Sequence, residues 1–321
     1  MSEPVAALGA ELAGVDGLVL REGAPLGPLT TYGVGGVAAL LVEVADAEAL
    51  AGLAAATAAH PDVAVLVVGL GSNLLVADEG FDGLAVVLGA GFTEIDIDGT
   101  LVRAGARAKL PVVARQTAGA GLTGFEWAAG VPGSIGGAVR MNAGVPDADM
   151  ADALERVRVV DLASGKDGVV PAADLALGYR TSSIRPTQVV AWAELRLVPG
   201  PAEAARAAIK EKTQWRRDHQ PGGRNAGSVF TNPPGDSAGR LIDASGCKGL
   251  RIGTAEVSPK HANFIQADEG GTAADVWALM AEVRRRVHEH SGVALHPETV
   301  VVGLTPLPAL PGEGPVPEGT A

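Results

Sequence analysis

The sequence predicts a mixed fold of helices and strands arranged in two domains. Its 321 residues suffice for two domains with substantial cores. Short apolar strand patterns and helical patterns occur together along the chain. A break at Pro199-Gly200-Pro201 separates the strand pattern of residues 189–197 from a long helical pattern that ends near His219. We therefore place the boundary between residues 200 and 201.

The first domain is expected to hold most of the strands. The Ala-rich segment Asp46–His60 and the segment Leu110–Ala120 are helical in pattern. Strand patterns cover Ala64–Val68, Leu84–Leu88, Glu94–Ile97, Leu101–Ala104 and Val189–Leu197, and Arg156–Leu162 with the turn at residues 163–166 predicts a hairpin.

The second domain is expected to be smaller. Ala238–Ala244 predicts a helix, Leu250–Val257 and Asn263–Ala267 predict strands, and Thr299–Leu304 predicts a closing strand. Thr272, with Asp275 three residues later, resembles a capping box that opens a helix to about His290. The expected boundaries are an N-terminal extension at 1–28, domains at 29–200 and 201–308, and a disordered, Pro/Gly-rich tail at 309–321.

Composition narrows the class of protein. The chain is 47% apolar but only 3% aromatic, so its core is expected to consist mainly of Ala, Val and Leu. No apolar run reaches the ~18 residues of a membrane span, and no signal pattern opens the sequence. The single cysteine, Cys247, fits a reducing compartment and a packed side chain. We expect a cytoplasmic monomer or weak oligomer without membrane insertion. His288 and His290 lack the spacing of a helical metal pair, so no metal site is expected.

The charge distribution indicates an anionic small molecule rather than nucleic acid. A formal charge of −12 opposes binding to nucleic acid. Positive residues nevertheless cluster late in the chain: Arg206, Lys210, Lys212, Arg216, Arg217, Arg224, Arg240, Lys248 and Arg251. We interpret Arg206 to Lys212 as a solvated helix face, and the later members as a local site for phosphates.

Two glycine-rich segments are candidates for binding a dinucleotide. Gly69-Leu70-Gly71-Ser72-Asn73 directly follows a strand pattern, but Leu74 stands where a Rossmann fingerprint needs glycine. Its backbone N–H groups and polar side chains suit phosphate oxygens. Taken alone, this segment is more simply a turn. A second segment at residues 130–137 favours a pyrophosphate cradle.

Three further segments carry the candidate chemistry. Residues 224–235 place Ser228 beside Gly227 and end with Asn232 before two prolines. Residues 179–182 read Tyr-Arg-Thr-Ser, and residues 295–298 read Leu-His-Pro-Glu. Alone, Arg180 fits an ion pair and Glu298 fits a surface turn.

Together these motifs resemble the UDP-N-acetylenolpyruvoylglucosamine reductase family. The resemblance also includes Leu29-Thr30-Thr31-Tyr32, Arg140-Met141-Asn142-Ala143-Gly144, Lys248-Gly249 and His261-Ala262-Asn263-Phe264. It runs in the family's order from about Leu29 to about Gly303. It implies an α+β fold, with a two-part FAD-binding domain of the vanillyl-alcohol oxidase (PCMH) type and a smaller α+β substrate domain.

The resemblance also implies a set of binding residues. FAD would contact Thr31, Gly69, Leu70, Gly71, Ser72, Asn73, Gly130, Pro132, Gly133, Ser134 and Gly137. These segments contain no histidine or cysteine, so non-covalent FAD is expected. The substrate, UDP-N-acetylglucosamine enolpyruvate, would contact Tyr179, Arg217, His219 and Asn232, with NADPH as co-substrate.

The implied reaction adds a hydride from reduced flavin to C3 of the enolpyruvyl group. Charge then develops on the neighbouring carboxylate, and Arg180 suits it because a guanidinium grips carboxylates. Glu298 would help only in its protonated form. Ser228 would protonate C2 as the general acid.

The sequence departs from the commonest family pattern at three places, and the first two keep the alternative of a non-catalytic paralogue open. Val145-Pro146-Asp147 replaces an aromatic-glycine pair, and His219 replaces a lysine. No tyrosine-bearing insertion lies between Val198 and His219, as in the family's shorter branch. The alternatives are a non-catalytic paralogue that binds flavin or nucleotide sugar, and a related flavin oxidase.

Overall fold

The chain forms two compact units, each assembled from separate stretches of sequence. The structure, a computed structural model, describes residues 1–311. Unit 1 consists of residues 1–24, 39–70 and 82–216. Unit 2 consists of residues 25–38, 71–81 and the described residues from 217 onward. The domain boundary after residue 200 remains a prediction, and most of the tail expected to be disordered, residues 309–321, lies outside the described residues.

The first sheet of unit 1 contains the N-terminal strands. Its four strands run in the order β1 (Leu18–Pro25), β2 (Val37–Val44), β5 (Phe81–Leu88) and β3 (Val65–Val68). β3 and β5 are parallel. Helices α1 (Glu3–Leu12) and α2 (Ala47–Ala58) pack on each other, and their apolar side chains join the core that contains Leu40 and Val86. Asp46 begins α2 because its carboxylate accepts hydrogen bonds from the free N–H groups of Glu48 and Ala49.

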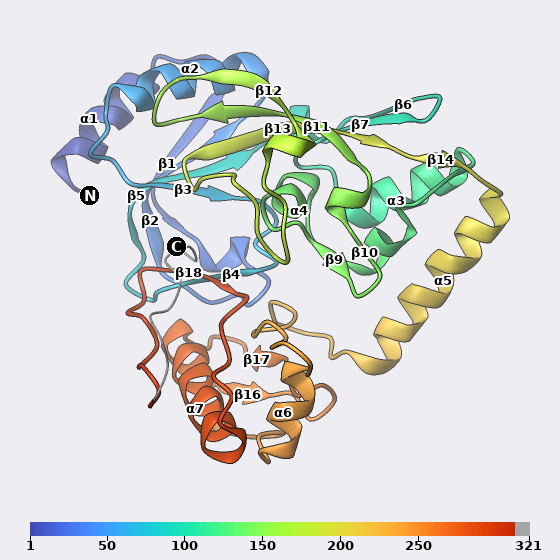
Figure 1. Cartoon of the computed structure of the whole chain (residues 1–321). Coiled ribbons are helices and arrows are strands. Elements are labelled where there is room, and N and C mark those ends of the chain that lie inside the picture. The colour runs from blue at the N-terminus through green and yellow to red at the C-terminus, as the bar shows by residue number, and fades with distance from the viewer. Residues whose placement is uncertain (312–321) are drawn as a thin grey trace. The chain divides into compact units, whose positions relative to one another are not determined.

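The second sheet of unit 1 is antiparallel and has five strands. They run in the order β12 (Asp167–Pro171), β11 (Leu154–Asp161), β13 (Gln188–Arg196), β7 (Leu101–Gly105) and β6 (Ile95–Asp98). α4 (Ile135–Arg140) contacts β13 and β7, and α3 (Leu110–Gly119) contacts the 3-10 helix η3 (Glu126–Gly130). Figure 1 shows α4 beside β13, which it contacts.

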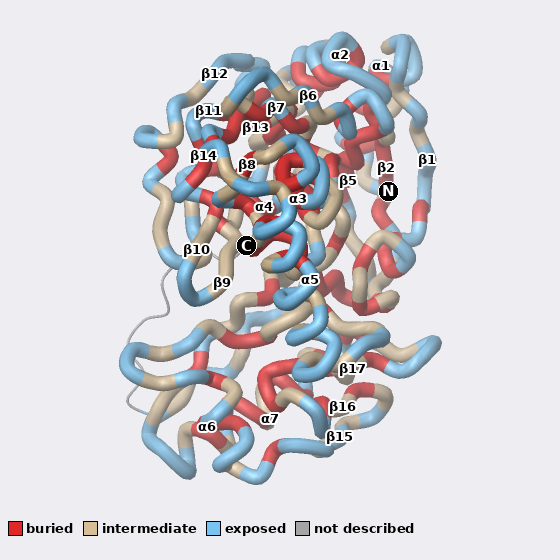
Figure 2. Tube along the Cα trace, turned by 90° about the vertical axis from the view of Figure 1, so that its right-hand side faces the viewer, coloured by how far each residue is buried: buried red, intermediate tan, exposed pale blue. Residues whose placement is uncertain are grey.

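Shorter elements complete unit 1. They are the strand pairs β8 (Leu122–Thr123) with β14 (Val198–Pro199) and β9 (Gly144–Val145) with β10 (Ala148–Asp149), and the 3-10 helices η2 (Ala90–Phe92), η4 (Met150–Asp152) and η5 (Ala172–Asp174). The long helix α5 (Ala202–His219) is mostly exposed, as its pale blue trace in Figure 2 shows.

In unit 2, one helix packs on a small antiparallel sheet and a second helix packs on the first. The sheet contains β15 (Arg251–Ile252), β16 (Ala255–Val257) and β17 (Ile265–Ala267), and the helices are α6 (Ala238–Ala244) and α7 (Ala273–Ser291). A parallel pair joins β4 (Leu74–Val76) to β18 (Val300–Val302), and η1 (Gly27–Leu29) precedes Thr30. Cys247 is fully buried in this core and burial raises the pKa of its thiol, as befits a packed side chain.

Two local predictions for unit 2 need correction. The single strand expected at Leu250–Val257 is a short hairpin, because Gly253 takes a left-handed conformation (φ +51°) between β15 and β16. Thr272 does begin α7 by accepting a hydrogen bond from the Asp275 N–H (3.2 Å). The reciprocal half of the capping box is missing, since Asp275 instead accepts hydrogen bonds from the N–H and hydroxyl of Thr254.

None of the helices in residues 1–311 combines the length and the apolar character that crossing a membrane requires.

Candidate active site

The loop after β3 contains a glycine, Gly71, at a position that has no room for a side chain. Gly71 has φ +60°, and a Cβ there would lie 2.0 Å from the Leu29 carbonyl oxygen. Thr31 seals the same contact, since its N–H and hydroxyl donate to the Gly71 carbonyl at 3.0 and 3.3 Å. Within unit 2, the structure thus brings together the predicted flavin residues Thr31 and Gly71, which lie 40 residues apart.

Within unit 1, the second glycine-rich loop (residues 130–137) lies beside Gly69 of the first glycine-rich loop. A Cβ on Gly69 would lie 3.2 Å from the Ser134 hydroxyl oxygen. Ser134 is buried at the start of α4, and the Gly133 carbonyl accepts a hydrogen bond from Leu110 N–H at 3.0 Å. Gly69, Pro132 and Gly137 are exposed, so their backbone is open to a bound molecule.

Buried polar atoms next to these loops support a fit to FAD. The Asn73 side-chain nitrogen donates to the Glu298 carbonyl at 2.9 Å, whereas its buried Oδ1 has no hydrogen-bond partner among residues 1–311. The buried Trp127 indole N–H, in η3 just before the second loop, also lacks a partner there. Buried polar groups normally find partners, so a ligand with donors and acceptors suits these positions. Leu70 and Ser72 are half-buried within the first loop.

Arg180 occupies a strained position in a tight turn of unit 1. Gly178 and Thr181 exchange backbone hydrogen bonds of 3.0 and 3.2 Å across the turn, and Arg180 has φ +57°. A left-handed conformation costs a non-glycine residue about 1–3 kcal/mol, and such strain is concentrated at functional sites. The Arg180 Nη2 donates to the Gly144 carbonyl (3.0 Å), and the guanidinium lies 5.1 Å from the exposed ring of Tyr179.

Ser228 and Glu298 lie on adjoining segments of unit 2. The Glu298 N–H donates to the carbonyl of Val229, the residue after Ser228, at 2.9 Å. Phe230 and Pro297 form an isolated antiparallel β-bridge. Gly227 has φ +79° immediately before Ser228, a conformation that favours glycine. The half-buried Ser228 hydroxyl has no hydrogen-bond partner in the described part of the chain. Both residues are therefore held by the backbone, and the Ser228 hydroxyl can donate to a ligand.

The predicted substrate residues of unit 2 lie at two places. The exposed Asn232 accepts a hydrogen bond from Ala238 N–H (3.0 Å) through its side-chain oxygen, just before α6. Arg217 and His219 are exposed at the end of α5. Lys260, which the sequence did not single out, donates to the Arg217 carbonyl at 2.5 Å. Its partner lies 43 positions away, so only the fold reveals this contact.

The predicted phosphate site formed by the late positive cluster is not supported for four of its members. Each has a carboxylate partner: Arg224 with Glu269, Arg240 with Asp236, Lys248 with Asp243, and Arg251 with both Glu256 and Asp268. These pairs are exposed, and such pairs neutralise charge locally. Arg216 differs, because its Cδ lies 2.8 Å from where a Cβ on Gly130 would stand, and burial lowers the pKa of its guanidinium.

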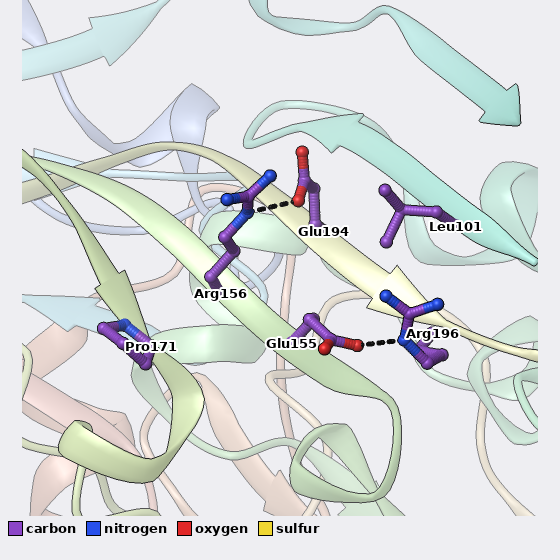
Figure 3. Close-up of a pocket in the computed structure, with 6 residues that line it drawn as sticks. All are labelled: Leu101, Glu155, Arg156, Pro171, Glu194 and Arg196. Carbon is purple, nitrogen blue, oxygen red and sulfur yellow. Dashed lines mark hydrogen bonds and ion pairs between the residues drawn. The ribbon is translucent and has the colours of Figure 1, made fainter.

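A surface cavity of about 380 Å³ in unit 1 is lined by none of these residues. Figure 3 shows its lining, in which Glu155 pairs with Arg196 and Glu194 with Arg156, both at 2.5 Å. The hydrogen bond from Arg156 is the main reason why the pKa of Glu194 lies below its usual range. Since these four charged groups are already paired, the cavity is a poor candidate for the active site.

The sequence matches two known protein-family models and is similar to enzymes of one family. Residues 38–167 match the family model described as FAD binding domain, and residues 219–302 match the one described as UDP-N-acetylenolpyruvoylglucosamine reductase, C-terminal domain. The enzyme of that name from Acidiphilium cryptum is 44% identical over 87% of this chain and 90% of its own length. The one from Anaeromyxobacter dehalogenans is 43% identical over 93% of this chain and 90% of its own.

The chain belongs to the UDP-N-acetylenolpyruvoylglucosamine reductase family.

A solved structure of a family member agrees with the fold. The crystal structure of the Thermus caldophilus reductase is similar with a TM-score of 0.76 and 38% identity, covering 89% of this chain and 98% of that one. As a member of this reductase family, the protein is an oxidoreductase with an FAD-binding domain, and the predicted two-part α+β fold is confirmed. The departure at Val145-Pro146-Asp147 forms the end of the β9–β10 hairpin.

Proposed function

We propose that the protein reduces UDP-N-acetylglucosamine enolpyruvate to UDP-N-acetylmuramate, with NADPH as the electron donor and non-covalently bound FAD. Family membership supports the reaction class. The observation that carries the proposal is the Ser228 hydroxyl, which has no hydrogen-bond partner among residues 1–311 and lies on a segment hydrogen-bonded to the Glu298 segment. A hydroxyl placed in this way is free to give its proton to a substrate.

The cofactor would be held by the two glycine-rich loops. Gly69, Leu70, Gly130, Pro132, Gly133, Ser134 and Gly137 in unit 1 and Thr31, Gly71, Ser72 and Asn73 in unit 2 are the proposed contacts. Their backbone N–H groups suit a pyrophosphate. When bound, FAD relays a hydride from NADPH to C3 of the enolpyruvyl ether.

The chain's own residues would handle the charge and the proton. Arg180 binds the substrate carboxylate, where negative charge accumulates as the C3–H bond forms. Ser228 then gives its proton to C2, so one hydride and one proton add across the double bond. Glu298, when protonated, donates a hydrogen bond to the same charge. Water exclusion matters here, because a serine hydroxyl is a weak acid.

The nucleotide part of the substrate would be bound by Tyr179, Arg217, His219 and Asn232. His219 stands where the family pattern has a lysine. Lys260 donates a hydrogen bond to the Arg217 carbonyl, which places a second basic side chain next to this segment. We further propose a cytoplasmic location, which suits a nucleotide-linked substrate and the single buried thiol.

The test is anaerobic NADPH oxidation by the purified yellow protein, with and without the enolpyruvyl substrate. We expect sustained oxidation only with substrate, and UDP-N-acetylmuramate as the product. Flavin bleaching that stops after one equivalent despite added substrate would contradict the proposal. A binding paralogue would behave in that way, whereas rapid reoxidation of the reduced flavin when air is then admitted would indicate an oxidase.

A further inference from the structure

The turn that contains Arg180 is hydrogen-bonded to the buried side-chain amide of Asn142. Asn142 is 2% exposed, and its side-chain nitrogen donates to the Gly178 carbonyl, at the start of the turn, at 3.0 Å. The same nitrogen donates to Asp149 Oδ2 at 3.0 Å, and the side-chain oxygen accepts from Ala151 N–H at 2.9 Å. An amide carries two donors and an acceptor on one small group, and all are used here.

Asn142 is itself held in a special conformation. Its φ of +39° is left-handed, which asparagine tolerates better than most residues. The conformation lies at the end of α4 and before β9, so the chain reverses there and leads into Gly144. Asn142 therefore joins the β9–β10 hairpin to the Arg180 turn.

The same short segment contacts the turn at two more points. The Arg180 Nη2 donates to the Gly144 carbonyl at 3.0 Å, and the Ser182 hydroxyl donates to the Arg140 carbonyl at 2.7 Å. Residues 140–144 thus bind the turn before, at and after Arg180. Three contacts on one segment fix where the guanidinium lies.

We propose that Asn142 is a positioning residue for the reaction: its amide holds the Gly178–Thr181 turn so that Arg180 meets the substrate carboxylate. The inference rests on the proposed function. It predicts that loss of the amide slows the step in which substrate is reduced and leaves the reduction of flavin by NADPH unchanged. A misplacement of about 1 Å is expected to slow that step by about 100-fold.

The experiment measures the two half-reactions separately by stopped-flow flavin absorbance. Asn142→Gly removes the amide and keeps the left-handed backbone, which glycine accepts. Thr57→Ala is the control, since it removes another buried side-chain hydrogen bond of unit 1 (to the Leu53 carbonyl, 2.8 Å) far from the turn in sequence. Reoxidation of flavin by the enolpyruvyl substrate should slow by about 100-fold in Asn142→Gly only.

A double-mutant cycle with Arg180→Met tests whether Asn142 acts through Arg180. We expect Asn142→Gly to slow the Arg180→Met enzyme by about twofold or less, because the two effects share one cause. Multiplicative effects, or equal slowing of both half-reactions, would overturn the proposal. Loss of FAD from Asn142→Gly alone would overturn it as well.

A second variant covers failure of Asn142→Gly to fold. Asn142→Asp keeps the shape and the acceptor for Ala151 but loses the hydrogen bonds that the amide donates to Gly178 and to Asp149. If folded Asn142→Asp is reoxidised at the wild-type rate, Asn142 does not position Arg180. If the wild-type enzyme itself is not reoxidised by the substrate, the proposed function fails instead, so the two failures are distinguishable.

Discussion

At the scale of single residues, the proposed chemistry depends on backbone conformations that most residues avoid. Arg180 and Asn142 both have positive φ, and Gly71 and Gly227 occupy positions that only glycine takes easily. The motifs that contain these residues could be identified from the sequence, because they are defined by residue type and by spacing along the chain. The hydrogen bonds that hold them could not, since Asn142 and Gly178 are 36 positions apart.

Ser228→Ala should nearly abolish substrate-dependent turnover, by about 100- to 10,000-fold, because no proton reaches C2. Flavin reduction by NADPH should continue at the wild-type rate. Both are measured anaerobically by flavin absorbance. Ser245→Ala, which removes another serine hydroxyl from unit 2, is the control and should retain activity. Survival of turnover in Ser228→Ala would mean that another group is the acid.

Gly71→Ala should lower both the stability of the protein and the amount of FAD that it binds. The new Cβ would lie 2.0 Å from the Leu29 carbonyl, and overpacking of this kind costs about 1–3 kcal/mol. Gly235→Ala is a matched control, because Gly235 also has positive φ (+77°) but has no atom within 4 Å of the added Cβ. The melting temperature and the amount of bound FAD should both fall further in Gly71→Ala than in Gly235→Ala. Equal behaviour of the two variants would contradict the clash.

At the scale of elements, local pattern sufficed where a segment is regular. The predicted helices at residues 46–60 and 110–120 and the helix after Thr272 lie at α2, α3 and α7 to within a few residues. α1, β1 and β2 were not predicted, although Val5, Leu8 and Leu12 have helical spacing and β2 is apolar except for Glu43. The hairpin at Gly253 was missed because the contacts of Asp275 with Thr254, across 21 residues, draw the chain back there.

The helix α7 should carry a pH-dependent share of stability. Hydrogen bonds from Arg285, and secondly from Arg286, lower the pKa of Glu282 to about 2. An unfolded glutamate has a pKa near 4.3. The lowered value means that the pairing stabilises the fold above pH ~4.3 and is lost as the pH falls toward 2. The melting temperatures of wild type and Glu282→Gln should therefore differ at pH 7 and converge as the pH falls from ~4 toward 2.

Glu211→Gln is the control for this comparison. Glu211 is exposed on α5 and has no ion pair among the described residues. Its substitution removes the same charge without removing a partner, so its melting temperature should follow wild type at every pH. A constant difference between Glu282→Gln and wild type down to pH 2 would show that the ion pairs are not the cause.

At the scale of the whole molecule, the cofactor is expected to contribute to stability. The two units are each interleaved in sequence, and glycine-rich loop residues occur in both. A ligand that binds only the folded state stabilises it by RT ln(1 + [L]/Kd), about 2.7 kcal/mol at 100 times Kd. FAD-stripped protein should melt at a lower temperature and recover as FAD is added, measured by circular dichroism. An unchanged melting temperature would mean that these loops do not bind FAD.

The sequence by itself determined the family, the motifs and many of the regular elements, because these depend on residue type and short spacing. The tertiary structure decided the rest. It grouped residues 25–38 and 71–81 with the C-terminal part, placed the Glu298 segment against the Ser228 segment, and paired four predicted phosphate-binding cations with carboxylates. The grouping of the units, the Glu298–Ser228 arrangement and the Arg224–Glu269 pair depend on contacts between distant positions. Neither local propensity nor periodicity encodes which distant partner satisfies a buried or charged group.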